Sequence, residues 1–177
     1  DTFRDEHHHA FGYDTADVIY VKRMLQHALP SKLRRTLADD LFAQTVSSDA
    51  GSFADDLYCN VDDLREMHEA GLMIGSHGNA HVWLDRMNAD EQRADIFNSF
   101  RLFDAIGMPN SNFTFCYPYG SYNEETLSCL EAMCCVAAFT TKPESATPGS
   151  DGLLEIPRLD TNVFPPRAQA APFAMTA

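Results

Sequence analysis

The residues best suited to chemistry are two histidines, His77 and His81, four positions apart in the segment Ile-Gly-Ser-His-Gly-Asn-Ala-His. If this segment turns helically, positions i and i+4 share a face, and both imidazoles can bind one metal ion. Neutral imidazole suits Zn²⁺, and also cobalt or nickel. Histidine pairs at this spacing are more often structural or accidental than metal-binding, so the hypothesis depends on the surrounding segments.

A second polar segment, residues 117–123 (Tyr-Pro-Tyr-Gly-Ser-Tyr-Asn), follows a predicted strand. Pro118 and Gly120 stiffen and turn the chain there, which lets a backbone N–H face a ligand. Tyr119 and Tyr122 offer aromatic faces on which a sugar ring can stack. The alternative is an ordinary Pro/Gly turn whose tyrosines belong to the core.

A third polar segment follows the last predicted strand and contains Arg158 and Asp160, two positions apart. Residues at this spacing face the same side of a strand, so on their own they favour a simple ion pair. Ligand sites in α/β sheets lie at the carboxyl ends of the strands. We therefore expect the three polar segments to meet at one site.

Apolar periodicity, helix caps and Pro/Gly breaks predict helices and strands that alternate after residue 60. The expected helices span residues 15–29, 60–71, 88–106 and 123–133, and a further helix follows a cap at Ser31. Thr15 is another expected cap, and Asn88 with Glu91 forms an expected capping box. The helix after Ser31 is expected to carry an apolar stripe of Leu33, Leu37 and Leu41. The expected strands span residues 72–74, 113–117, 136–139 and 153–156, and residues 47–58 have the composition of a loop. This alternation predicts parallel strands covered by helices, an α/β fold.

The composition is that of a globular protein and disfavours several classes of partner. The 177 residues are 45% hydrophobic and carry a formal net charge of -13, which opposes binding to nucleic acid or to anionic membrane surfaces. No apolar run approaches the roughly 20 residues of a membrane span. The cysteine count is odd, five, with Cys134 next to Cys135, which favours free thiols in the cytoplasm over a secreted disulfide framework.

Three segments of the chain resemble motifs of one known family, the NodB-type polysaccharide deacetylases, over roughly residues 55–165. Residues 69–84 (EAGLMIGSHGNAHVWL) resemble its histidine motif, and residues 115–123 (FCYPYGSYN) resemble its Tyr-Pro-Tyr-Gly motif. Residues 154–162 (LEIPRLDTN) resemble a Pro-Arg-Leu-Asp segment of members linked to surface-polysaccharide synthesis. The resemblance implies an irregular (β/α) barrel of about seven strands.

The resemblance also implies roles for particular residues. His77 and His81 would be two ligands of a divalent metal, most simply Zn²⁺, with Co²⁺ or Ni²⁺ as alternatives. The backbone N–H of Tyr119 would stabilise the oxyanion of the tetrahedral intermediate, and Arg158 would steady the catalytic base, since this sequence lacks the arginine that often begins the Tyr-Pro-Tyr-Gly motif. The substrate groove would be formed by Tyr117, Pro118, Tyr119 and Gly120.

The implied reaction is metal-dependent removal of N-acetyl groups from an amino sugar, in a polysaccharide or its precursor. An activated water attacks the N-acetyl carbonyl, the metal and the loop N–H stabilise the negative charge, and acetate leaves from a free amine. The alternative is a degenerate family member that binds carbohydrate without hydrolysing it.

The sequence departs from the family at the catalytic aspartates. The family places its base and third metal ligand in an Asp-Asp pair at the end of a first strand, and no adjacent aspartates before His77 follow an apolar strand. We therefore expect residues 1–165 to be a partial deacetylase domain whose first strand or strands lie upstream of Asp1. Residues 166–177, rich in proline and alanine, are expected to form a tail or linker.

Overall fold

The structure is a computed structural model that describes residues 2–11, 14–147, 149–150 and 152–164. The chain divides into two compact units, Asp1–Asn60 and Val61–Ala177. The segment 1–165 expected to form one domain therefore contains parts of both units, and the expected tail 166–177 lies outside the described residues. Across the described ranges, none of the helices has the length and apolar character needed to cross a membrane.

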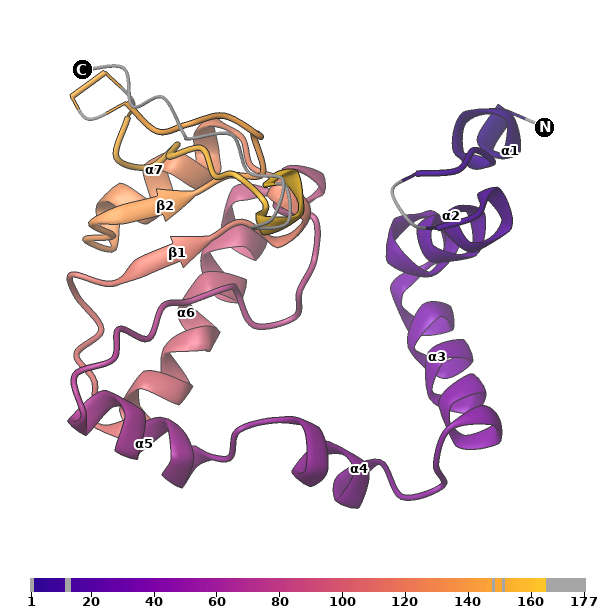
Figure 1. Cartoon of the computed structure of the whole chain (residues 1–177), viewed down its shortest axis with the longest axis horizontal. Helices are drawn as coiled ribbons and strands as arrows, with labels where there is room; N and C mark the ends of the chain where they lie inside the picture. The colour runs from indigo at the N-terminus through magenta and orange to yellow at the C-terminus, as the bar shows by residue number, and fades with distance from the viewer. Residues whose placement is uncertain (1, 12–13, 148, 151, 165–177) are drawn as a thin grey trace. The chain divides into compact units, whose positions relative to one another are not determined.

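The first unit consists mainly of helices (Figure 1). They are α1 (Thr2–His7), α2 (Ala16–Arg23), the π-helical turn η1 (Met24–Ala28), α3 (Ser31–Thr45) and α4 (Ala50–Leu57). Thr15 caps α2 as expected, because its side chain accepts a hydrogen bond from the Val18 N–H. At α3 the cap position is Pro30, so Ser31 is the first helical residue rather than the cap.

The expectation that residues 47–58 form a loop is wrong, because α4 occupies most of them. Asp49 caps this helix by accepting hydrogen bonds from the Ser52 N–H at 3.0 Å and from the Ser52 hydroxyl at 2.8 Å. The rings of Phe42 and Phe53 pack edge to face with centroids 5.2 Å apart, which holds α4 against α3. The Asp49 cap and the aromatic contact thus stabilise a helix in a segment whose small polar residues favour a loop.

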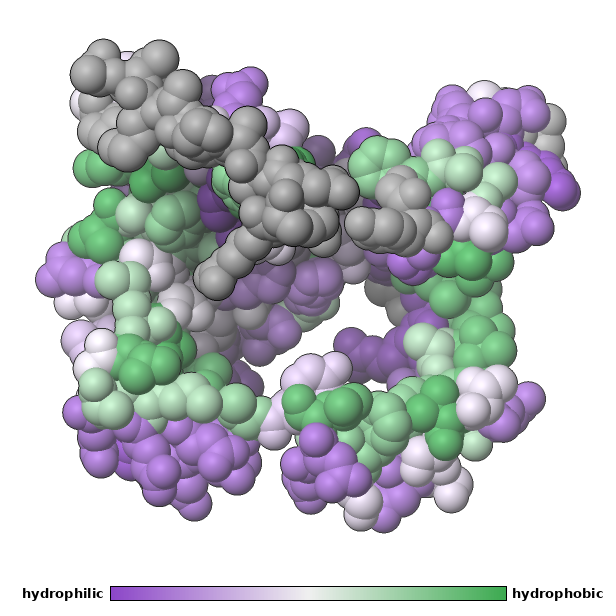
Figure 2. Space-filling model, viewed as in Figure 1, coloured by the Kyte–Doolittle hydropathy of each residue, from purple (hydrophilic) through white to green (hydrophobic). Residues whose placement is uncertain are grey.

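Helix α3 carries its predicted apolar stripe on an exposed face. Leu33, Leu37 and Leu41 are 46%, 37% and 48% exposed. Figure 2 shows apolar surface along this helix and on α4. The predicted helix is therefore confirmed. Its apolar stripe is exposed rather than packed into a core.

The second unit is built on a parallel sheet, which confirms the predicted α/β class. Strands β1 (Thr114–Cys116) and β2 (Ala137–Phe139) pair in parallel with Phe115 opposite Ala138. Parallel bridges add Ser76 beside Phe115 on one side and Ile156 beside Phe139 on the other. The carboxyl ends of these four segments therefore lie along one edge of the sheet.

The buried strand predicted over residues 72–74 is wrong. Leu72 and Met73 are 52% and 81% exposed, and the sheet is joined only at Ser76. A run of three apolar residues does not show whether other segments cover it. Residues 153–156 likewise hydrogen-bond to β2 through Leu153 and Ile156 without forming a regular strand.

Two helices pack on this sheet, α6 (Ala89–Ile106) and α7 (Glu124–Ala132), and α5 (Val61–Glu69) packs against α6. The predicted capping box is present at α6, where Asn88 and Glu91 bond to each other's backbone N–H, and Gly107 ends the helix with φ 81°. Asn123 caps α7. Short 3₁₀ turns complete the unit: η2 (Leu84–Arg86), η3 (Pro118–Gly120) and η4 (Thr161–Val163).

The core of the second unit lies where α6 and α7 pack on the two strands. Its members include Phe100, Phe103, Phe113, Phe115, Tyr117 and Leu130. The Phe100 and Phe113 rings meet edge to face with centroids 4.9 Å apart. This core fixes the strand ends from which the polar segments emerge.

Candidate active site

His77 leaves the sheet directly after the bridge at Ser76, and its ring is oriented by the neighbouring strand. Its Nδ1 lies 2.6 Å from the backbone oxygen of Cys116, the last residue of β1. A carbonyl only accepts hydrogen bonds, so Nδ1 carries the hydrogen and donates it. In the neutral ring Nε2 is then the atom with a free lone pair, the arrangement typical of metal-binding histidines.

His81 lies next to His77, although the segment between them does not form the helical turn that the spacing suggested. The two ring centroids are 4.9 Å apart with the planes at 60°. Nδ1 of His81 lies 3.0 Å from the hydroxyl of Tyr119, a residue of the second polar segment. Burial lowers the pKa of His81, and the charge of His77 lowers it further, so the neutral form that a metal requires is favoured.

Tyr119 sits in a strained turn that other side chains hold in place. Its φ is 58°, in the left-handed region, which costs a residue with a Cβ roughly 1–2 kcal/mol. The indole of Trp83 stacks on its ring with centroids 5.2 Å apart and planes at 18°. Such a stack contributes about 0.5–1.5 kcal/mol, which together with the His81 contact offsets the strain.

Gly120 continues the turn with φ 71°, and a Cβ there would collide with Thr141. The following residue ties this turn to the histidine segment. The hydroxyl of Ser121 donates to Asp85 Oδ1 at 2.6 Å and accepts from the Asp85 N–H at 3.0 Å. The Pro/Gly turn therefore needs glycine at position 120 and is anchored at position 121.

Tyr117 and Pro118, both assigned to the substrate groove, are buried in the structure. The Tyr117 hydroxyl donates to the backbone oxygen of Leu154 at 2.7 Å, and its ring stacks on Tyr122. Burial also raises the pKa of the Tyr117 phenol well above its usual range. These two residues can support a groove only from beneath, whereas Tyr119 and Gly120 are partly exposed.

Arg158 reaches the same strand ends from the third polar segment. Its Nε donates to the backbone oxygen of Thr140 at 3.0 Å, and Nη1 lies 3.6 Å from the Cys116 sulfur. The guanidinium also lies over the Phe139 ring. The structure thus brings Arg158 to the strand whose carbonyl orients His77, so all three polar segments gather at one edge of the sheet.

The histidine segment is anchored on α6 by two groups that the sequence reasoning missed in this role. The carboxyl of Asp95 accepts hydrogen bonds from the backbone N–H groups of Asn79 and Ala80. The Ser76 hydroxyl lies 2.7 Å from that of Ser99. The one local signal that could have indicated Asp95 is its place beside Ile96, next to the apolar face of the helix. No local signal indicates that Trp83 stacks on Tyr119.

Two imidazoles at this separation, each with one nitrogen held by a neighbour, fit two ligands of one divalent metal. Within the ranges that the structure describes, no group of three or more His, Cys, Asp or Glu side chains is placed to hold a metal ion. The candidate ligands that lie side by side here are therefore the two imidazoles of His77 and His81.

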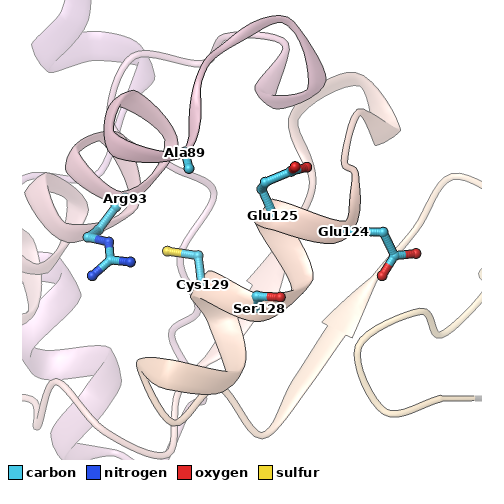
Figure 3. A pocket seen from close by; sticks show the side chains of 6 residues that line it. All are labelled: Ala89, Arg93, Glu124, Glu125, Ser128 and Cys129. Carbon is cyan, nitrogen blue, oxygen red and sulfur yellow. The ribbon is translucent and has the colours of Figure 1, made fainter.

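Cavities elsewhere in the second unit are lined by other residues. One of about 240 Å³ lies between α6 and α7, with Ala89 and Arg93 on one side and Glu124, Glu125, Ser128 and Cys129 on the other (Figure 3). Another, of about 500 Å³, is lined mainly by α7 and residues 152–155. Neither lining includes a residue predicted for the site. His77 and His81 are themselves exposed.

Comparison with known proteins agrees with the motifs. The sequence profile described as polysaccharide deacetylase matches residues 41–135, more than half of the chain. "Putative polysaccharide deacetylase YxkH" of Bacillus subtilis (strain 168) is 31% identical over 86 residues, which are 49% of this chain and 30% of that protein.

Among solved structures, the deacetylase PplD of Streptococcus pyogenes, in complex with acetate, is similar with a TM-score of 0.52 and 24% identity. The match covers 57% of this chain and 44% of PplD, which shows a shared fold. The chain thus spans less than half the length of either relative. Profile match and fold together show that this chain belongs to the polysaccharide deacetylase family.

Proposed function

We propose that this chain provides metal-binding and oxyanion-stabilising groups for the hydrolysis of N-acetyl groups on an amino sugar of a polysaccharide or its precursor. The observation that carries the proposal is the contact between the three polar segments: His77 beside His81, His81 against Tyr119, and Arg158 beside Cys116. The family resemblance supplies the substrate class.

The residues of the chain have separate tasks in this proposal. His77 and His81 hold the divalent ion, most simply Zn²⁺, through ring nitrogens. When bound, such an ion activates water and polarises the acetyl carbonyl. The N–H of Tyr119, in its left-handed turn, is a preorganised donor for the developing oxyanion, a role typically contributing about 3 kcal/mol.

Zinc binding and acetate release test this proposal together. The chain contains one tryptophan, Trp83, which stacks on Tyr119 next to His81, so its fluorescence reports on the site. We expect Zn²⁺ to change this fluorescence, and we expect acetate release from N-acetylglucosamine oligomers only when the expected upstream strand with its Asp-Asp pair is also present.

Variants assign the binding to this site. Both the fluorescence change and acetate release should be lost in His77→Ala and His81→Ala. His9→Ala, which alters an exposed histidine of the first unit, should keep both. Zinc binding that survives both site substitutions contradicts the metal proposal, and sugar binding without acetate release favours a non-catalytic carbohydrate-binding role.

We also propose that the chain works in a reducing compartment such as the cytoplasm. The cysteine usage supports this, and Cys59 and Cys134 are exposed thiols. Thiol labelling of protein isolated under native, alkylating conditions should detect five free thiols. Fewer would indicate that cysteines pair in the natural compartment.

A further inference from the structure

We infer that Asp95, on helix α6, is a positioning residue for the metal ligands: its carboxyl group fixes the loop between His77 and His81. The inference rests on the proposed function, because it takes these two histidines as ligands. Asp95 itself is not proposed as a ligand; it acts through its hydrogen bonds to the loop backbone.

The carboxyl group uses both of its oxygens on successive amides of the loop. Oδ2 accepts from the Asn79 N–H at 3.1 Å, and Oδ1 accepts from the Ala80 N–H at 2.9 Å. These two amides belong to residues between the two histidines, so the carboxyl group bridges the middle of the metal-binding segment.

Asp95 is buried, with 6% of its surface exposed. No basic side chain forms an ion pair with it in the part of the chain that the structure describes. A buried carboxyl group is costly unless hydrogen bonds satisfy it. Here those bonds come from the loop, so the stability of the buried group and the conformation of the loop depend on each other.

The loop approaches Asp95 of α6 closely at Gly78. A Cβ at this position would lie 2.6 Å from Asp95 Oδ2, and the residue has φ 74°. The helix can therefore meet the loop closely only where the side chain is absent and the backbone is left-handed.

A second hydrogen-bonded chain runs from the loop to the same helix. The Gly78 N–H donates to Ser76 Oγ at 3.3 Å, Ser76 Oγ lies 2.7 Å from Ser99 Oγ, and the Ser99 hydroxyl donates to the Ile96 oxygen at 2.6 Å. Since Ser99 uses its hydrogen on Ile96, Ser76 donates to Ser99. Asp95 and Ser99, one helical turn apart, thus hold the loop at two points.

The test replaces Asp95 by asparagine, which has the same shape but turns one acceptor into an N–H₂ donor facing a backbone N–H. We expect Asp95→Asn to weaken Zn²⁺ binding by roughly 10–100-fold in titration calorimetry, as loss of groups that orient metal ligands does. In amide hydrogen exchange, Asn79 and Ala80 should lose protection while the amides in the middle of α6 keep theirs. Asp90→Asn, an exposed change in the first turn of the same helix, should leave both measurements unchanged.

Wild-type zinc affinity together with wild-type protection of Asn79 and Ala80 in Asp95→Asn would overturn the inference. If the wild-type chain binds no Zn²⁺, the proposed metal site fails, and selective loss of protection at these two amides still supports Asp95 as the residue that fixes the loop. If Asp95→Asn does not fold, Gly78→Ala tests the same contact from the loop side, because its Cβ displaces the carboxyl group. Unchanged protection and affinity in Gly78→Ala would then overturn the inference.

Discussion

His81 and Tyr119 have positive φ angles of 50° and 58°, and the nearby Gly78 and Gly120 have φ of 74° and 71°. Glycine adopts this region without strain, whereas His and Tyr do so only when their surroundings stabilise it. The surroundings here are the Tyr119–His81 contact and the Trp83 stack. The reactive segments therefore depend on each other for their backbone conformation.

Gly120→Ala tests the turn that carries Tyr119. The new Cβ would collide with Thr141 and would sit on a left-handed backbone, so we expect a loss of about 2–4 kcal/mol in the free energy of unfolding. Denaturant unfolding measures this loss. Gly152→Ala is the matched control, because a Cβ at this position would lie 3.9 Å from its nearest neighbour, Glu155 Oε2. Equal stability of the two variants would contradict the expectation.

The raised pKa of Tyr122 predicts that the free energy of unfolding falls at alkaline pH. Burial raises its pKa from 10.0 to about 12, with further contributions from its hydrogen bond to Glu155 and from the Glu155 charge. Because the folded pKa lies above the unfolded value, the stabilisation is fully present below pH 10 and is lost as pH rises through 12. In an ultraviolet titration Tyr117 and Tyr122 should both ionise late, and the late step should be smaller by one tyrosine in Tyr122→Phe. A tyrosine absorbance titration identical in wild type and variant would refute the assignment.

At the scale of elements, α6 organises the site although it supplies no predicted ligand. One face packs Phe100 and Phe103 into the core, and the adjoining positions present Asp95 and Ser99 to the histidine segment. A change in how this helix begins or ends therefore affects both the core and the metal-binding loop.

Asn88→Ala removes the capping box of α6. The loss should lower the free energy of unfolding by about 1 kcal/mol, since the Glu91 N–H loses its side-chain acceptor. Urea denaturation checks this value, with Ser111→Ala, an exposed change outside the helices, as the control. A Glu91 amide that remains equally protected in Asn88→Ala would indicate that the cap contributes little.

At the scale of the whole molecule, burial is unequal between the two units. Of the buried apolar side chains among the described residues, Ile19 belongs to the first unit and the others to the second. Segments with few buried contacts open more readily than a packed core.

Hydrogen exchange should therefore distinguish the units. We expect the amides of α2, α3 and α4 to exchange faster than those of α6 and α7, because less apolar surface is buried around them. Mass spectrometry of proteolytic fragments of the exchanged, full chain measures this difference. Comparable protection in α3 and α6 would show that the first unit is covered in solution.

The sequence by itself determined the features that depend on neighbouring residues. Helix α6 begins after its cap, Asn88, and ends at Gly107, and both signals are local in the sequence. The strands around Phe115 and Ala138 follow from short apolar runs. The parallel pairing follows from alternation of strands and helices. The motifs around His77 and Tyr119 identified the family, because they are continuous in the chain.

Only the tertiary structure decided which of these residues are buried and what they contact. Tyr117, expected to form the substrate groove, is buried and donates a hydrogen bond to the Leu154 oxygen. Met73, expected in a buried strand, is exposed. The roles of Asp95 and Trp83 at the site depend on contacts with residues 15 and 36 positions away in the sequence, respectively. Caps and turns act within a few residues and are visible in the sequence, whereas burial and side-chain contacts depend on which distant segments meet.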